Sequence, residues 1–166
     1  MEKSIELKIE YDEKEIKKAI SFYMSRICNM RMYTIFVYTM AFAAILSSFL
    51  IEKYVLLSLI FAFLGIFVYH KVYRRSLDAH LNFNKKRKGG TYRFYADKIF
   101  ISGEEVQSEC LWSVFKEVYE IPSAFLLLDD NDFVYVFFKS CFADESEIVQ
   151  LRSLFSDRFS NFKIFC

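Results

Sequence analysis

Few residues of this chain have types and spacings that could carry out catalysis. Its two histidines, His70 and His80, lie ten residues apart, and no H-E-x-x-H, G-x-S-x-G or P-loop pattern occurs. A Cys141 nucleophile would need a base beside it, and neither histidine belongs to the C-terminal segment that contains Cys141. The sequence therefore predicts no catalytic, cofactor-binding or metal-binding residues. A small membrane enzyme without a recognisable motif stays an alternative.

The acidic run Asp129-Asp130-Asn131-Asp132 could suggest calcium binding. An EF-hand loop needs glycine at its sixth position and glutamate at its twelfth, where this chain has Val134 and Ser140. We expect a solvated hairpin turn instead, because Asp and Asn favour turns. The cysteines form no C-x-x-C pair, which indicates small apolar residues in a reducing compartment. They are Cys28, Cys110, Cys141 and Cys166.

A basic segment at residues 70–88 carries seven cations against one acid, Asp78, a net charge of +6. Each cation near an anionic leaflet is worth roughly 1 kcal/mol, so this segment could contact lipid headgroups. The same charges could instead serve only to orient the chain in a membrane, and we predict no binding to nucleic acid. The candidate lipid contacts are Lys71, Arg74, Arg75, Lys85, Lys86, Arg87 and Lys88.

Composition limits the elements that can position these residues. Of the 166 residues, 54% are hydrophobic, 19% are aromatic and 26% are charged, with a net charge of +1. Residues 33–51 contain no charge, and residues 54–69 contain none after the break at Glu52-Lys53. About 20 such residues cross a bilayer, and His70 and Lys71 can extend the second run by snorkelling. We predict a transmembrane hairpin over residues 33–72, with spans of about 33–51 and 54–72.

The distribution of Lys and Arg predicts the orientation of this hairpin. Residues 13–32 carry five cations and residues 70–88 carry seven, whereas the connection between the spans carries only Lys53. By the positive-inside rule, both termini lie in the cytoplasm. The acidic N-terminus has no apolar run of a signal peptide. The expected location is the bacterial inner membrane, which the chain crosses more than once.

The segments flanking the hairpin show helical and extended patterns. Residues 5–11 alternate between apolar and charged, which predicts a strand. Asp12 and Glu15 have capping-box spacing before an amphipathic helix, and together these elements make an N-terminal cytoplasmic segment over residues 1–32. Residues 73–90 are predicted as a basic juxtamembrane linker. Tyr73, Leu77 and Leu81 recur every fourth position, so the second span is predicted to continue there as a helix.

After Gly90 the pattern becomes that of an antiparallel meander. Six runs rich in Val, Ile, Phe and Tyr are separated by turn residues, at 91–96, 99–102, 106–111, 114–121, 124–128 and 133–138. Asp144 and Glu147 repeat the capping-box spacing before a helix with an apolar stripe. Residues 91–166 should therefore form a small curled sheet or barrel closed by a C-terminal helix, to which residues 1–11 can add a strand.

Short motifs in this C-terminal segment match a known pattern. Trp112-Ser113 follows a short strand, as in a tryptophan, serine, apolar, lysine, valine motif. Lys139 and Phe142 match the end of a last strand that usually reads proline, lysine, arginine, alanine, phenylalanine. With the two preceding spans, these motifs make residues 92–159 resemble the C-terminal domain of the YcxB-like family of bacterial membrane proteins. The resemblance implies a pleckstrin-homology-like fold and no activity, and the role of the family's arginine does not carry over because Ser140 replaces it.

These observations predict an α+β membrane protein. A two-helix transmembrane hairpin carries a small antiparallel sheet or barrel of pleckstrin-homology-like type, with Trp112 buried as an anchor. The expected function is non-enzymatic: an inner-membrane protein presents a cytoplasmic interaction or regulatory domain. An immunity-type protein that protects against a membrane-acting toxin is the alternative. The expected partners are the lipid bilayer and a protein that the sequence does not identify, and homo-oligomerisation stays open.

Overall fold

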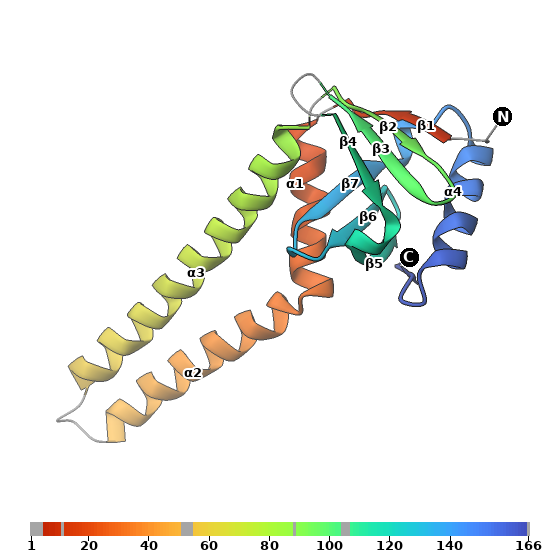
Figure 1. Ribbon diagram of the computed structural model, residues 1–166. Helices are drawn as coiled ribbons and strands as arrows, with labels where there is room; N and C mark the ends of the chain where they lie inside the picture. Colours follow the sequence, from red (N-terminus) through yellow and green to blue (C-terminus); the bar gives the residue numbers. More distant parts are fainter. Residues whose placement is uncertain (1–4, 11, 51–54, 88, 104–106, 166) are drawn as a thin grey trace. The chain divides into compact units, whose positions relative to one another are not determined.

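The chain divides into two compact units in the computed structural model, which describes all residues except 1–4, 11, 51–54, 88, 104–106 and 166 (Figure 1). Unit 1 contains Met1–Ala19 and His80–Cys166, and unit 2 contains Ile20–Ala79. These boundaries differ from the predicted ones at residues 32, 72 and 90. The difference arises because the N-terminal strand pairs with the C-terminal segment, so that one unit is built from both ends of the chain.

The first sheet of unit 1 joins the N-terminal strand to three strands that follow unit 2. Its order is β1 (Ile5–Lys8), β2 (Thr91–Phe94), β3 (Lys98–Ser102) and β4 (Gln107–Leu111). β1 is antiparallel to β2, with Ile5 opposite Phe94. Ile5 and Leu7 are buried while Glu6 and Lys8 are exposed, as the alternating sequence predicts. Unit 2 is therefore an insertion between two neighbouring strands of one sheet.

The second sheet contains β5 (Phe115–Ile121), β6 (Ala124–Asp129), β7 (Val134–Phe138) and β8 (Lys163–Ile164). Its order is β7-β6-β5-β8, and β8 runs parallel to β5. The six predicted strands are confirmed with shifted ends, and they are divided between two hydrogen-bonded sheets. Between β4 and β5 the chain makes a 3-10 turn at Trp112–Val114. At this turn, which contains the buried Trp112, the chain leaves the first sheet and enters the second.

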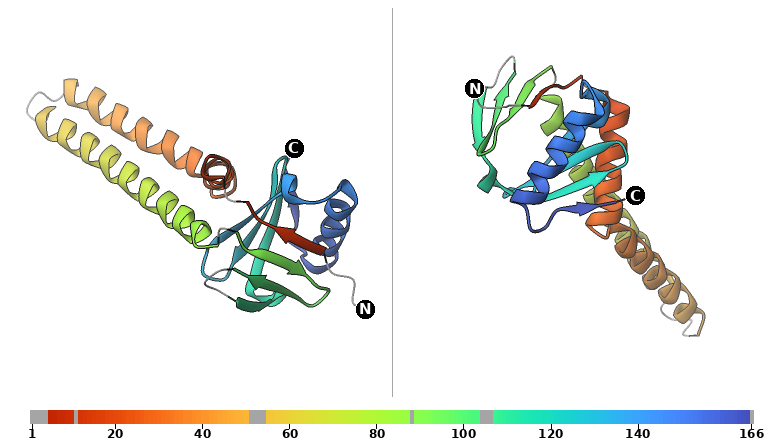
Figure 2. Two further views of the ribbon diagram at one scale, coloured as in Figure 1. Left: turned by 90° about the horizontal axis from the view of Figure 1, so that it is seen from above. Right: turned by 90° about the vertical axis from the view of Figure 1, so that its right-hand side faces the viewer.

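Helix α4 (Glu145–Arg158) closes unit 1 and begins where the sequence predicts. The Asp144 carboxylate accepts a hydrogen bond from the Glu147 backbone N–H at 3.0 Å, and Glu147 in turn accepts one from the Ala143 N–H at 3.0 Å. Ile148, Leu151 and Phe155 are buried in a core to which both sheets contribute. Figure 2 shows α4, in blue, lying beside the sheets of unit 1.

Unit 2 consists mainly of helix. α1 (Glu13–Phe22) starts in unit 1 and leads through a π-helical turn at Tyr23–Ile27 to α2 (Met30–Leu50), and α3 (Val55–Lys85) follows. Asn29 separates the turn from α2 with a positive φ of 53°, a backbone conformation that asparagine tolerates better than most residues. The predicted helical continuation beyond the second span is confirmed, and most of the segment predicted as a linker is part of α3.

α2 and α3 run antiparallel (Figures 1 and 2), and on each helix the less exposed side chains follow a helical spacing. The Thr34 and Tyr69 hydroxyls are hydrogen-bonded to each other, and the Tyr38 hydroxyl lies 3.0 Å from His70 Nε2. Small residues let two helices approach closely. The less exposed positions recur every three or four residues: Met30, Thr34, Val37, Ala41 and Ala44 in α2, and Ser58, Ala62, Ile66, Tyr69 and Tyr73 in α3.

The described residues include one helix that is long and apolar enough to cross a membrane. This helix covers Leu56–Lys85, and none of its apolar window is buried. α2 meets the same test only together with the helical segment before it, from which it is bent by 66°. The connection at residues 51–54 and the charges Glu52 and Lys53 lie outside the described residues.

Candidate functional site

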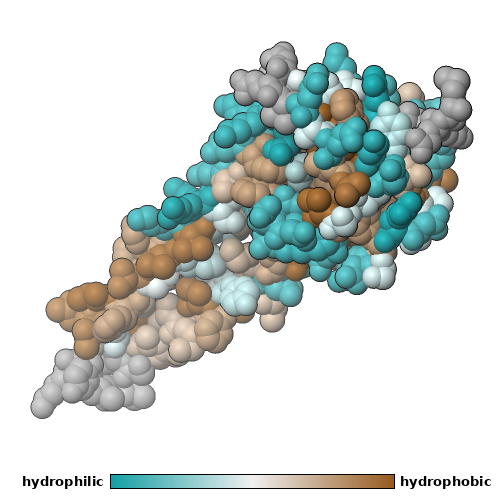
Figure 3. All heavy atoms as spheres, viewed as in Figure 1, coloured by the Kyte–Doolittle hydropathy of each residue, from teal (hydrophilic) through white to brown (hydrophobic). Residues whose placement is uncertain are grey.

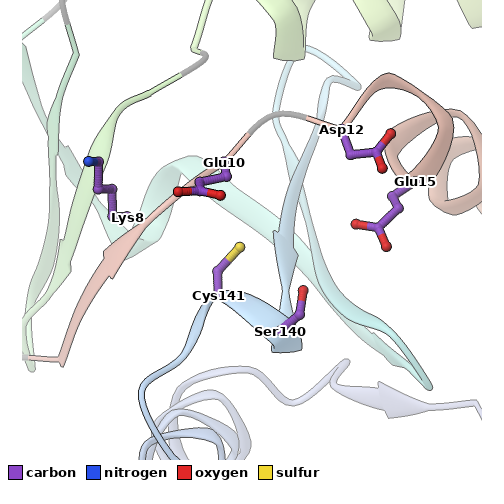
Figure 4. A pocket seen from close by; sticks show the side chains of 6 residues that line it. All are labelled: Lys8, Glu10, Asp12, Glu15, Ser140 and Cys141. Atoms are coloured by element: carbon purple, nitrogen blue, oxygen red, sulfur yellow. The ribbon is translucent and has the colours of Figure 1, made fainter.

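A polar groove opens on unit 1 where the end of β1 passes the end of β7. It encloses about 630 Å³, and the residues that line it come from β1, the following loop, the start of α1 and the turn after β7 (Figure 4). They are Lys8, Glu10, Asp12, Glu15, Ser140 and Cys141. The groove therefore joins residues that are more than 120 positions apart in the sequence, and the pairing of β1 with β2 holds the two segments together.

The chemistry of this groove is that of an acidic surface rather than of a catalytic centre. The lining contains the carboxylates of Glu10, Asp12 and Glu15 and the amine of Lys8, so it carries a net charge of −2 at neutral pH. Cys141 is half-buried, but the described lining contains no histidine that could serve as its base. Within the described part of the chain, no group of three or more His, Cys, Asp or Glu residues is arranged to hold a metal ion.

A second polar centre is an ion cluster around the buried Glu120 carboxylate on β5. Lys139 Nζ lies 2.7 Å from Glu120 Oε1, and Arg152 donates to both oxygens, from Nη2 at 2.6 Å and from Nε at 2.8 Å. The Glu120 side chain is only 3% exposed, whereas Lys139 and Arg152 are 21% and 36% exposed. The cluster ties β5 to the end of β7 and to α4, and its cations reach solvent on their outer sides.

The pKa of Glu120 reflects this environment. Burial by itself would raise its pKa, but hydrogen bonds from Arg152 and Lys139 and the charges of both cations outweigh burial and hold the pKa below its ordinary value. The carboxylate is thus ionised although it is buried. An ionised group whose oxygens are all engaged by cations is a structural link, so this cluster organises the fold and is not a free acid or base.

The motif residues on which the resemblance rests have structural roles, with one exception. Trp112 is 6% exposed, donates its Nε1–H to the Tyr95 carbonyl at 3.1 Å and contacts the rings of α4. Phe142 is buried against Phe125, and Lys139 belongs to the ion cluster. Ser113 is exposed, and nothing in the structure explains its place in the motif.

The predicted lipid-contact residues separate into three groups. Lys71, Arg74 and Arg75 are exposed in unit 2, and Lys85 and Lys86 are exposed in unit 1. Lys88 lies outside the described residues. The Arg87 guanidinium lies 3.7 Å from the centre of the Phe83 ring and 4.9 Å from that of Tyr135, and it donates to the Phe83 carbonyl at 3.0 Å. Arg87 thus also packs within unit 1.

The acidic run at residues 129–132 forms the turn between β6 and β7, as predicted. The Asp129 carboxylate is buried and accepts backbone hydrogen bonds from Asn131 at 2.9 Å and from Phe133 at 2.8 Å. Asp132 adopts a positive φ of 64°. The Asp129 carboxylate therefore stabilises the turn through its backbone hydrogen bonds.

Trp112, Lys139 and Phe142, which carry the predicted resemblance, all lie in a segment of unit 1 that matches a known family. Residues 94–155 match the family model described as YcxB-like protein. The predicted resemblance is confirmed for this segment, which runs from β2 into α4 and leaves unit 2 outside the match. Comparisons with curated proteins and with solved structures found no match. The family description names no activity.

The groove and the ion cluster were both missed by sequence reasoning. Within the YcxB-like segment, Lys139 stands out through its motif, but Glu120 and Arg152 belong to no motif. The acidic residues of the groove precede that segment in the sequence. Their pattern is the one expected of acidic residues at any solvent-exposed helix N-terminus. No local sequence pattern indicates that the end of β1 and Cys141 line one groove. Their proximity depends on the tertiary structure of unit 1, in which β1 pairs with β2 across the inserted unit.

Proposed function

We propose that this protein is a non-enzymatic membrane-anchored module: unit 2 crosses the inner membrane as a helical hairpin, and unit 1 is an interaction or regulatory domain on its cytoplasmic side. The observation that carries this proposal is the exposure of large apolar side chains on α3. Phe63 is 78% exposed, Leu56 74% and Phe61 62%. Soluble proteins rarely expose contiguous apolar patches of more than a few hundred Å², so a lipid environment accounts best for this surface.

The distribution of hydropathy supports the same proposal. In Figure 3 apolar side chains, in brown, cover much of the visible surface of α2 and α3, whereas hydrophilic side chains, in teal, cover much of the visible surface of unit 1. An α3 of 31 residues is about 46 Å long at 1.5 Å per residue. That length exceeds the roughly 30 Å of a hydrocarbon core, so the helix can span the core and still project its basic end into water.

The pairing of β1 with β2 supports a hairpin rather than a single crossing. β1 precedes unit 2 and β2 follows it, and the two strands are hydrogen-bonded neighbours. Strands that share a sheet must lie on the same side of a bilayer. The inserted unit therefore has to cross an even number of times, and two antiparallel apolar helices are the simplest solution.

The interaction role rests on the character of unit 1. Unit 1 carries 16 cations and 19 carboxylates, a net charge of −3, and its residues 89–166 alone have a net charge of −6. The groove beside β1 is also acidic. Such a surface favours a basic segment of a partner protein, and the described groove residues lack a nucleophile with its base. Two sheets and a C-terminal helix are also what the expected pleckstrin-homology-like fold requires, which supports that fold for unit 1.

The proposal is tested with the full chain in bacterial membranes. We expect the protein to resist alkaline carbonate extraction and to float with phosphatidylcholine vesicles after reconstitution. A photo-crosslinking residue at Ser140, in the groove, should give a defined adduct in cells, while the same residue at the exposed Ser160 serves as the control. Extraction by carbonate would contradict the membrane anchor, and equal labelling from both positions would contradict a groove-specific partner.

A further inference from the structure

We propose that Arg31, Lys71, Arg74 and Arg75 form a binding site for the phosphate of anionic phospholipids, at the end of the helical hairpin that adjoins the cytoplasm. This inference rests on the proposed membrane insertion of unit 2 and identifies the lipid that the inserted hairpin prefers. All four residues belong to unit 2. They are exposed, and among the described residues none of them forms an ion pair.

The helical geometry gathers three of these cations on one face. Lys71, Arg74 and Arg75 have the i, i+3, i+4 spacing that places side chains side by side on a helix. The opposite face of the same turns carries Tyr69 and Tyr73, which are less exposed. The three cations span four residues, or about 6 Å of helix rise, so a single headgroup layer can contact all of them.

The pairing of α2 with α3 brings Arg31 to the same end of the hairpin. Tyr69 of α3 is hydrogen-bonded to Thr34 and lies 3.4 Å from the Met30 carbonyl, and Arg31 is the next residue of α2. An exposed tyrosine, Tyr33, lies in the same turn of α2 as Arg31. Aromatic side chains with a polar tip prefer the headgroup level of a membrane, and arginine binds phosphate through two parallel hydrogen bonds.

The alternative is that these charges only orient the chain during insertion. Orientation depends on the number of cations near the ends of a span. It does not need them to gather exposed on one helix face, whereas a phosphate site uses cations that lie side by side and reach the ligand. Residues 89–166, with a net charge of −6, are expected to be repelled by an anionic leaflet.

The test measures lipid binding by the full chain in a neutral detergent, where orientation in a bilayer plays no part. Native mass spectrometry counts phosphatidylglycerol and phosphatidylcholine adducts at equal lipid concentrations. We expect a clear preference for phosphatidylglycerol. Because each cation is worth about 1 kcal/mol and 1.4 kcal/mol is tenfold in affinity, neutralising three cations should weaken that binding about a hundredfold. The test variant is Lys71→Gln/Arg74→Gln/Arg75→Gln.

A matched variant, Lys14→Gln/Lys85→Gln/Lys86→Gln, removes three other exposed cations and should keep the preference. Equal loss in both variants, or no preference in the parent protein, would overturn the inference. Displacement of the lipid by millimolar inorganic phosphate would show that the ligand is a free anion, which also overturns it. Flotation with phosphatidylcholine vesicles tests insertion separately: failure there rejects the proposed function, whereas insertion without lipid preference rejects only this inference.

Discussion

At the scale of single residues, Trp112 connects the first sheet, the second sheet and α4. Its ring stacks 6.3 Å from that of Phe94 on β2 and meets Phe155 of α4 edge-on at 5.8 Å. A residue that contacts three elements at once cannot be replaced by a smaller one without leaving a cavity among all of them. Its burial therefore contributes to stability and leaves no face of the indole for a ligand.

Truncation of this side chain should destabilise unit 1. We expect Trp112→Ala to lower the free energy of unfolding by about 3–5 kcal/mol, the usual cost of removing a buried aromatic residue. The measurement is chemical unfolding of the full chain in detergent, followed by near-ultraviolet circular dichroism. Leu111→Ala is the control, because Leu111 is 59% exposed and should change stability by less than about 0.5 kcal/mol. An unchanged unfolding midpoint for Trp112→Ala would refute the structural role.

The Glu120 cluster makes a different prediction, because only one of its three members is deeply buried. Lys139→Met/Arg152→Met leaves the carboxylate without partners and should cost about 3–5 kcal/mol. Glu120→Gln leaves cations that can turn to solvent, so it should cost less, about 1–3 kcal/mol. Lys139→Met alone or Arg152→Met alone should each lower the free energy of unfolding by well under half of the loss in the double variant. Additive effects in the same unfolding measurement would show that the two cations do not share the carboxylate.

Stability should also fall in acid because of Glu120. Its pKa in the folded chain is below the ordinary value of 4.5, so the unfolded chain takes up a proton at a higher pH than the folded chain does. Below about pH 4.5 the free energy of unfolding therefore decreases as pH falls, and above it this contribution is constant. Unfolding midpoints measured from about pH 6 to pH 3 should show a shallower decline in Glu120→Gln. Glu109→Gln, which removes an exposed carboxylate paired with Lys98, is the control variant.

Sequence reasoning could anticipate Trp112 but not this cluster, for a physical reason. A lone tryptophan beside a strand is buried in most settings, so its environment follows from its type. Glu120, in contrast, reads as one more charged residue on a strand. It becomes a buried carboxylate only because β8 covers β5 on one side, where Phe165 donates to the Glu120 carbonyl at 2.8 Å, and because α4 brings Arg152 across it.

At the scale of elements, local patterns predicted what each segment is but not what it pairs with. Alternation identified β1, and runs of β-branched and aromatic residues between turn residues identified six strands after Gly90. Capping residues identified the start of α4. The division into two sheets depends on the 3-10 turn at Trp112–Val114, which has no periodic signature. β8 has only two residues, too few for any pattern, and it pairs in parallel with β5, which lies before α4 in the chain.

The seam between α2 and α3 allows a sharp test with one substitution at two positions. Ala41 is 8% exposed and lies in the row of small residues that faces α3, whereas Ala43 is exposed. Ala41→Leu should separate the helices and destabilise the hairpin by about 1–3 kcal/mol, the usual cost of overpacking. Ala43→Leu should be tolerated, since its side chain points to the surroundings. Thermal aggregation of the two variants in detergent compares them directly, and equal behaviour would contradict the assigned seam.

At the scale of the whole molecule, the insertion of unit 2 between β1 and β2 has a consequence for folding. The entropic cost of closing a loop grows with its length, and some 80 residues separate these neighbouring strands. An antiparallel α2–α3 hairpin brings its own two ends together and so shortens the effective loop. We infer that hairpin formation precedes the pairing of β1 with β2, and that the full chain is needed for a complete first sheet.

The same insertion supports the last prediction, that both termini lie on the cytoplasmic side. Two independent arguments agree on it. The pairing of β1 with β2 favours one side for both strands. The cations favour the cytoplasm as that side, with five in residues 13–32 and seven in residues 70–88 against Lys53 alone in the connection. A reporter fused after Cys166 should therefore be active only in the cytoplasm.

In a variant with all four native cysteines replaced by Ser, Glu52→Cys should react with a membrane-impermeant thiol reagent added outside the inner membrane, whereas Ser160→Cys should not. Reporter activity on the outer side would reverse the orientation, and protection of both cysteines would show that the hairpin does not cross the membrane.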